Sequence, residues 1–293
     1  MNGDLVFSSK YTFNNASTNG VQSLIQIDST HVLIAYRDVG NSSYGTACIG
    51  TISNNTISWG SEYVFNSAST ATHITCAKLD STHFVIYYNS NNSQTYGIVG
   101  TISNGNQITW GTAVSTAIGN TAYGTCQRID DTHFITAYRS PSPYYGRVMV
   151  GTVSSGDVIT WGSAVAFNSA STSGVALTVF DTSKFVVSYT DAGNSNYGTC
   201  IVGSLDGSFV PSFSGASEYV FNYATSNIWT TKVDSTHFLL SYTDGGNSSY
   251  GTCQLATVSD NTVSYGGEVV FNSNSTQYIH MSLLDSTHFV PLS

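Results

Sequence analysis

The sequence is a succession of short apolar or alternating runs, each ended by a cluster of Gly, Asn, Ser, Asp or Thr. Residues 31–37 (HVLIAYR) form an almost continuous apolar run, which is typical of a strand covered on both faces. Turn-forming residues then separate this run from residues 44–52 (YGTACIGTI) and 56–65 (TISWGSEYVF). Together with residues 20–27 these runs make four predicted strands, A to D. No segment has the three-four apolar spacing of an amphipathic helix, so the pattern predicts an all-β protein.

The four-strand pattern recurs along the whole chain. The residue that opens strand B recurs in steps of 52, 50, 51, 53 and 51, at His31, His83, His133, Lys184, His237 and His288. An aromatic column keeps the same phase at Phe7, Trp59, Trp110, Trp161, Phe213 and Tyr265. Four antiparallel strands repeated at about 51 residues are typical of β-propeller blades. We therefore expect residues 1–293 to form a single domain, a six-bladed β-propeller, whose repeats we number 1 to 6.

The ends of the chain predict an unusual closure of the ring. The segment from Leu5 to Phe13 has the pattern of a strand D, and the sequence stops after strands A and B of repeat 6. We expect the N-terminal strand to close the last blade, which lacks its own strand C. A strand D cannot replace strand C beside B, because it would run parallel to B. A neighbouring chain could supply the strand, so we expect homo-oligomerisation through the incomplete blade.

Composition limits the classes of binding partner and the cellular location expected for the protein. Charged residues make up 9% of the chain, and the net charge is −9 with eight Lys and Arg, which disfavours nucleic acid as a partner. No apolar run approaches the length that membrane insertion needs. The N-terminus has no signal-peptide pattern, yet the polar, lysine-poor composition predicts an extracellular, secreted or virion-associated protein. The five cysteines lie in predicted strands, which favours burial over a disulfide framework.

One motif combines an acid, two hydroxyls and a histidine. It reads DSTHF at 80–84, 234–238 and 285–289, with variants at 28–32, 130–134 and 181–185. Because it lies between strands A and B, we expect its Asp to accept backbone N–H groups of a tight turn, with Ser and Thr reinforcing that turn. Lys184 replaces the histidine in one copy. We therefore interpret the motif as scaffold and assign no catalytic residue to it.

The loops between strands B and C carry a family resemblance. The segments YTDAGNSNYGT (189–199) and YTDGGNSSYGT (242–252) resemble the Asp-box of sialidase-like propellers, Ser-x-Asp-x-Gly-x-Thr-Trp, through Asp191, Gly193, Asp244 and Gly246. Asp38 and Gly40 repeat the pattern in repeat 1. The resemblance implies a propeller fold. We expect the loop aspartates to cap their own turns; a Ca²⁺ site is the alternative, and no metal ligand or other cofactor is assigned.

Candidate binding residues lie where the repeat is broken. Near the start of strand A, seven and five positions before the turn Asp, the side chains differ between repeats and would face the propeller axis. The most ligand-like of them are His73, Tyr123, Asn227, Trp229, Tyr278 and His280. The B–C loop of repeat 3, YRSPSPYYGR at 138–147, adds Arg139, Tyr144, Tyr145 and Arg147. The alternatives are side chains that plug the channel and a loop that is merely rigid.

These features favour a non-catalytic recognition module that binds carbohydrate in the manner of a lectin. Aromatic rings can stack on sugar faces while Arg and amides reach hydroxyl groups. The expected partner is a glycan or glycoprotein surface. One alternative is a polysaccharide lyase or glycoside hydrolase at the channel mouth, with His73 or His280 and Tyr123 or Tyr278 as acid and base. Another is a structural or assembly protein without a small ligand.

Overall fold

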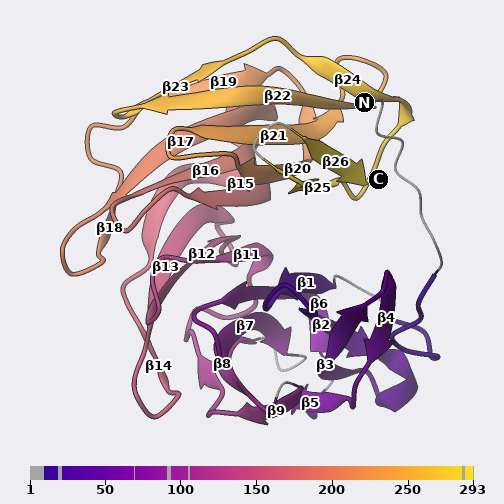
Figure 1. The fold of residues 1–293 in the computed structure, drawn as a ribbon. Helices are drawn as coiled ribbons and strands as arrows, with labels where there is room; N and C mark the ends of the chain where they lie inside the picture. Colours follow the sequence, from indigo (N-terminus) through magenta and orange to yellow (C-terminus); the bar gives the residue numbers. More distant parts are fainter. Residues whose placement is uncertain are drawn as a thin grey trace. The chain divides into compact units, whose positions relative to one another are not determined.

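The computed structural model describes residues 10–18, 22–68, 70–90, 94–104, 106–285 and 288–292 (Figure 1). Nearly all regular structure in these residues is β-strand, and the two short 3-10 helices are η1 (Val39–Asn41) and η2 (Ala192–Asn194). The all-β prediction is therefore confirmed. The chain divides into two compact units. Unit 1 comprises residues 1–117 and 154–159, and unit 2 comprises residues 118–153 and 160–293.

Unit 1 contains the sheets of repeats 1 and 2. In the first sheet the order is β1-β2-β3-β4, and β5 also pairs with β3. Its strands are β1 (Ser23–Gln26), β2 (His31–Asp38), β3 (Tyr44–Ser53), β4 (Thr56–Trp59) and β5 (Tyr63–Asn66). The second sheet has the order β10-β8-β7-β6, with β9 on β8. Its strands are β6 (Thr70–Lys78), β7 (His83–Ser90), β8 (Gln94–Ser103), β9 (Gln107–Trp110) and β10 (Val114–Ser115).

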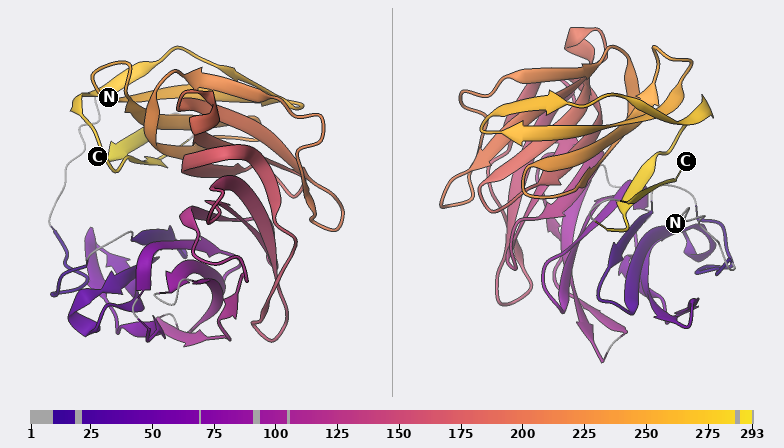
Figure 2. Two further views of the ribbon diagram at one scale, coloured as in Figure 1. Left: turned by 180° about the vertical axis from the view of Figure 1, so that it is seen from behind. Right: turned by 45° about the horizontal axis from the view of Figure 1, so that its top comes forward.

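Unit 2 contains repeats 3 to 6, and Figure 2 shows its sheets as successive layers whose colours follow the chain. A nine-stranded sheet joins repeats 3 and 4, because the long strand β15 pairs with β13 and then with β16. It consists of β11 (Ala122–Arg128), β12 (His133–Arg139), β13 (Tyr145–Val153), β14 (Ile159–Trp161), β15 (Val165–Val179), β16 (Lys184–Asp191), β17 (Tyr197–Leu205), β18 (Pro211–Ser212) and β19 (Glu218–Asn222).

The rest of unit 2 forms two smaller sheets. Repeat 5 contributes β20 (Thr225–Lys232), β21 (His237–Asp244), β22 (Tyr250–Ser259), β23 (Thr262–Tyr265) and β24 (Val269–Ser275). Repeat 6 contributes the antiparallel pair β25 (His280–Leu283) and β26 (Phe289–Leu292). The predicted N-terminal strand lies largely outside the described residues, as does Phe7 of the aromatic column. The described residues from Lys10 to Phe13 form no strand.

Each complete repeat follows the predicted order A to D, with one difference in strand D. Repeat 1 shows the difference: β4 and β5 both pair with β3 but are separated by residues 60–62. The backbone N–H of Gly60 donates to the carbonyl of Ile49 at 2.9 Å, which keeps the interrupted segment on the sheet. Strand D is therefore two short strands, which the alternation of the sequence alone did not reveal.

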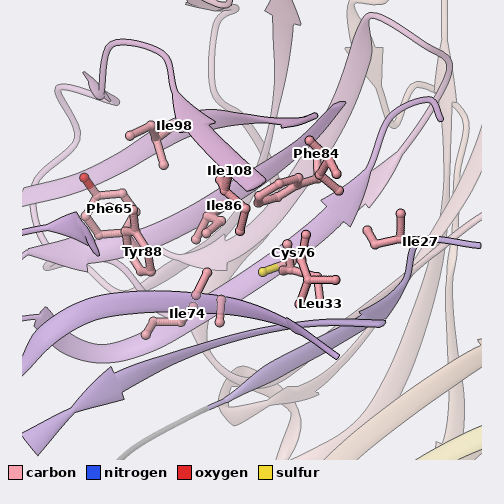
Figure 3. Packing of buried hydrophobic residues seen from close by; sticks show 14 residues of the cluster. Ile27, Leu33, Phe65, Ile74, Cys76, Phe84, Ile86, Tyr88, Ile98 and Ile108 are labelled. Atoms are coloured by element: carbon pink, nitrogen blue, oxygen red, sulfur yellow. The ribbon is translucent and has the colours of Figure 1, made fainter. Parts of the chain in front are cut away.

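Strand B forms the core of repeats 1 to 5, as its apolar run predicted, whereas Phe289 in strand B of repeat 6 is exposed. In β7, every residue after His83 is buried. Phe84 packs so closely on β8 that a Cβ atom on Gly100 would lie 2.3 Å from its ring, which explains the glycine there. Figure 3 shows Phe84 with Leu33, Ile86 and other side chains of the cluster that joins repeats 1 and 2. Cys76 belongs to this cluster, and all five cysteines are buried and form no disulfide, which confirms the prediction of burial.

Aromatic contacts join the end of one repeat to strand B of the next. The ring of Phe65, at the end of β5, lies 5.0 Å from Tyr88 of β7 and 5.7 Å from Trp110 of β9. The equivalent Phe–Tyr pairs within each unit have centroid distances of 4.9 to 5.1 Å and are Phe13–Tyr36, Phe167–Tyr189 and Phe221–Tyr242. Trp110 of the aromatic column therefore takes part in the joint between repeats 1 and 2.

The A–B turns are self-contained, as predicted for scaffold. The Asp80 carboxylate accepts the backbone N–H groups of Thr82 and His83, both at 2.7 Å, and its second oxygen lies 2.8 Å from Nδ1 of the His83 ring. The Thr82 hydroxyl approaches the same Nδ1 at 3.1 Å. Nε2 of His83 lies 3.5 Å from the Asp157 carboxylate, outside the turn. A catalytic triad needs its acid and its hydroxyl on opposite ring nitrogens, so Asp80, Thr82 and His83 do not form one.

Candidate functional site

The start of strand A departs from regular strand geometry in unit 2. The residue seven positions before the turn Asp has a positive φ in each of these repeats: 54° at Tyr123, 56° at Gly174, 50° at Asn227 and 56° at Tyr278. Register shifts at the same place mark β-bulges between Ala122 and Thr125, Ser173 and Ala176, and Ser226 and Trp229. Regular strand alternation is therefore interrupted there, because a bulge re-aims the side chain.

The residue types at this position differ in how well they suit a left-handed backbone. Glycine adopts it without steric penalty and asparagine is enriched there, but a bulky side chain is strained by about 1–2 kcal/mol. Tyr123 and Tyr278 nevertheless occupy it, and their side chains are 40% and 80% exposed. Backbone strain of this kind gathers at functional sites, so both exposed tyrosines are candidates for binding.

Tyr123 lies in a cluster that combines the two predicted sets of candidates. The guanidinium carbon of Arg139 lies 4.8 Å from the ring centroid of Tyr123 and 5.1 Å from that of Tyr144. Tyr144 is 48% exposed and also has a positive φ, of 70°. We call Tyr123, Arg139 and Tyr144 the arginine cluster. The start of β11, the end of β12 and the following loop bring together residues that the sequence had left in separate groups.

Arg139 is the charged member of the cluster. It is half-buried, and its Nε atom is buried without a hydrogen-bond partner. Within the described part of the chain, the arginine that forms an ion pair is Arg128, with Asp131. The Arg139 charge is held mainly by the two tyrosine rings, and cation–π contacts of this kind contribute about 0.5–1 kcal/mol each. Such a site presents hydrogen-bond donors between two aromatic faces.

The other two residues predicted from this loop lie in strand β13. Tyr145 is half-buried and is in register with Ser171 of β15. Arg147 is opposite Tyr138 and is also half-buried. Burial raises the pKa of the Tyr138 hydroxyl, and the charge of Arg147 opposes that rise. We therefore do not include Tyr145 and Arg147 in the arginine cluster, and their binding role stays a prediction.

The remaining strand A candidates form smaller groups. The Trp229 and His280 rings lie 4.3 Å apart, and the indole Nε1 of Trp229 donates to the Met281 carbonyl at 3.0 Å. His280 is exposed by surface area, yet shielding by its neighbours lowers the pKa of its imidazole. Asn227 donates from Nδ2 to the Thr243 hydroxyl at 3.1 Å. In unit 1, Nδ1 of His73 lies 3.4 Å from the Asn89 amide nitrogen.

The loop aspartates cap their own turns, as predicted. Asp38 accepts the backbone N–H of Asn41 at 3.2 Å, while Asp191 and Asp244 accept those of Gly193 and Gly246 at 2.9 Å. All three aspartates are buried. In the described ranges, no three His, Cys, Asp or Glu side chains gather as a metal site would require.

A cleft in unit 1 was not anticipated from the sequence. Its volume is about 770 Å³, and it is lined by Phe13, Asn14, Asn15, Ala16, Asp38, Gly40, Asn41, Trp59, Gly60 and Glu62. Asp38 is the aspartate that was expected to cap its own turn, and no role was expected for Glu62. The sequence does contain a pattern that points to these two acids. The loop aspartate and the strand D glutamate are both present in repeats 1, 4 and 5 and both missing in repeats 2 and 3.

Comparisons with solved structures place the chain among propeller-like, lectin-like folds. It is similar to a protein of unknown function from Dyadobacter fermentans at 13% identity, with a TM-score of 0.58, covering 95% of this chain and 90% of that one. It is also similar to the SapL1 lectin, solved with α-methyl fucoside, at 12% identity, with a TM-score of 0.54 and coverage of 89% and 81%. At these identities the likeness shows the fold alone.

Two other solved structures are matched over only part of their length. The chain spans 33% of a prolyl endopeptidase chain and 33% of the NanB sialidase from Streptococcus pneumoniae, both with a TM-score of 0.49. No family model and no curated protein matches the sequence. Among the described residues, no helix has the length and apolar character needed to span a bilayer.

Proposed function

We propose that this protein is a non-catalytic recognition protein that binds carbohydrate through the arginine cluster. The observation that carries the proposal is the guanidinium of Arg139 between two exposed tyrosine rings on left-handed backbone. Tyr123 and Tyr144 offer apolar faces for a sugar ring, and Arg139 offers donors for its hydroxyl oxygens. The fold-level likeness to a lectin solved with α-methyl fucoside supports this chemistry.

The wider architecture is part of the proposal. We propose that the six repeats form the blades of one propeller domain, with the N-terminal segment closing the last blade and oligomerisation at the incomplete blade. The partner would be a glycan or glycoprotein surface in an extracellular, secreted or virion-associated setting. Several weak sites on such a scaffold would raise the overall affinity through multivalency. The repeat spacing and the propeller-like neighbours support this arrangement.

A glycan array probed with the purified chain tests the proposal. We expect saturable binding to a related set of sugars, unchanged by EDTA because the described residues contain no group of three metal-ligating side chains. Replacing Tyr144 by Ala should lower binding about tenfold, since stacked aromatic anchors contribute on the order of 1–2 kcal/mol. Ser249→Ala is the matched control, because Ser249 occupies the corresponding loop position in repeat 5 and also has a positive φ. Absence of binding to every glycan would overturn the proposal.

A further inference from the structure

The cleft of unit 1 has a chemistry opposite to that of the arginine cluster. Two aromatic residues, Phe13 and Trp59, line it together with the acids Asp38 and Glu62. The rings of Phe13 and Trp59 lie 5.8 Å apart in an edge-to-face arrangement. Lys, Arg and His are all missing from its described lining. Its only charges are therefore negative.

Both acids are held in place but retain acceptor capacity. Oδ1 of Asp38 accepts the Asn41 backbone N–H, and Oε1 of Glu62 accepts the Tyr36 hydroxyl at 2.5 Å. A carboxylate has about four lone-pair sites, so one hydrogen bond to each group leaves most of its capacity unused. Glu62 is exposed, and Asp38 is buried at the cleft wall. The cleft lining thus holds two carboxylates that are fixed by hydrogen bonds, together with two aromatic rings.

The same constellation recurs twice in unit 2. Tyr189 donates to Glu218 at 2.7 Å, and Tyr242 donates to Glu268 at 2.6 Å. The preceding repeat supplies an amide that reaches one of the acids. In repeat 4, Asn168 donates to Asp191 at 2.9 Å, and in repeat 5 the equivalent Asn222 donates to Glu268 at 3.2 Å. In each of these repeats the asparagine therefore reaches one of the two acids.

The two acids are present together or missing together. Repeats 2 and 3 have Ser90 and Ser140 in place of the loop aspartate, and neither has an acid in its strand D segment, at 111–118 or 162–168. Their core tyrosines, Tyr88 and Tyr138, are buried all the same. Because the fold accommodates this tyrosine without a glutamate, packing alone does not account for Glu62, Glu218 and Glu268.

We propose that the cleft of repeat 1 binds a small polar ligand that carries an ammonium group, the chemical class of an amino sugar. The ammonium would lie between the Asp38 and Glu62 carboxylates, and the ring of the ligand would pack on Phe13 and Trp59. The constellations of repeats 4 and 5 would take the same class. The negative lining excludes acidic sugars, which separates this specificity from that of the arginine cluster.

Titration with three monosaccharides that share one ring tests the proposal: glucosamine, glucose and glucuronate. By isothermal titration calorimetry at low salt, we expect glucosamine to bind about five- to tenfold more tightly than glucose, and glucuronate to bind least, because exposed charge pairs contribute on the order of 1 kcal/mol. Raising the salt should reduce the preference by screening. Equal affinity for glucosamine and glucose, or no binding of glucosamine, would overturn the proposal.

Two variants locate the effect. The Glu62→Gln, Glu218→Gln and Glu268→Gln triple variant keeps an acceptor for each tyrosine hydroxyl while removing three charges, and it should lose the preference for glucosamine. Arg139→Ala should leave that preference unchanged, so failure of the arginine cluster as a glycan site and failure of the acidic cleft are separate outcomes. If the triple variant does not fold, the discrimination among the three sugars by the unaltered protein still decides the matter.

Discussion

The two ends of strand A differ in which features recur from repeat to repeat. At the A–B turn, the Asp, Thr and His of repeats 1, 2, 3 and 5 make the same hydrogen bonds within a few tenths of an ångström. At the opposite end, unit 2 keeps the left-handed backbone but changes the side chain from repeat to repeat. The turn is a fixed structural device. The start of strand A keeps its backbone conformation in unit 2 but presents side chains that vary among the repeats.

The comparison shows why residue type alone misleads. The A–B turn contains Asp, Ser, Thr and His, the chemistry of a hydrolase, yet its acid is saturated by local N–H groups. The strand start has no such combination of acid, hydroxyl and histidine, yet Arg139 and two strained tyrosines meet beside it. In a repeat protein, groups that satisfy one another locally are scaffold, whereas exposed and strained groups are candidates for binding.

Removing the aspartate carboxylate from an A–B turn should have the largest effect on stability. Asp80→Ala removes the acceptor of the Thr82 and His83 backbone N–H groups, and we expect the free energy of unfolding to fall by about 1–2 kcal/mol. Glycan binding should not change. Chemical denaturation and glycan titration of the same sample measure both. Asp80→Asn, which keeps an acceptor, is the control and should lose less; a drop in glycan affinity at unchanged stability would contradict the scaffold role.

The turn end should also set the response to acid. For Asp80, desolvation alone would raise the pKa, but hydrogen bonds from Thr82 and His83 outweigh it and lower the pKa to about 2. The backbone N–H of Thr236 is the largest cause that lowers the pKa of Asp234 to about 2. Since both folded values lie below the unfolded value near 3.8, the stabilisation is complete above about pH 4 and is lost as the pH falls through 2.

Acid titration of unfolding checks this expectation. The unaltered chain should keep its folded circular dichroism signal down to about pH 3 and lose stability steeply below it. Asp80→Asn should flatten the part of the pH dependence below pH 4, because Asn does not titrate. A variant whose stability still falls as steeply in that range would show that other carboxylates control the acid response.

Substitutions at the start of strand A should change the free energy of unfolding by less than Asp80→Ala does, and relief of backbone strain there should raise it. Tyr278→Asn places at repeat 6 the residue that repeat 5 has at the same position, and relief of left-handed strain should raise the free energy of unfolding by about 0.5 kcal/mol. Gly174→Ala is the mirror test and should lower it by about 1 kcal/mol, because φ is +56° there. Equal signs for the two substitutions, measured by urea denaturation, would contradict the strain argument.

The sequence predicted the parts of the structure that depend on local pattern. The apolar run of strand B, the A–B turn chemistry and the burial of the cysteines follow from periodicity and residue type, and the structure confirms them. The arginine cluster does not follow from pattern, because a bulge between Ala122 and Thr125 re-aims Tyr123 toward Arg139 of the next strand. Positive φ at a tyrosine leaves no mark in a hydrophobic pattern, so no alternation rule finds it.

Isothermal titration of Arg139→Ala and Arg147→Ala with the strongest array ligand tests the central claim most directly. Both arginines are half-buried in adjacent strands, but only Arg139 lies between exposed tyrosine rings. We expect Arg139→Ala to lower affinity at least tenfold and Arg147→Ala to leave it within twofold, since truncating a central arginine contact costs about 1.4 kcal/mol or more. Equal losses from both variants, or an unchanged affinity for Arg139→Ala, would contradict recognition at the arginine cluster.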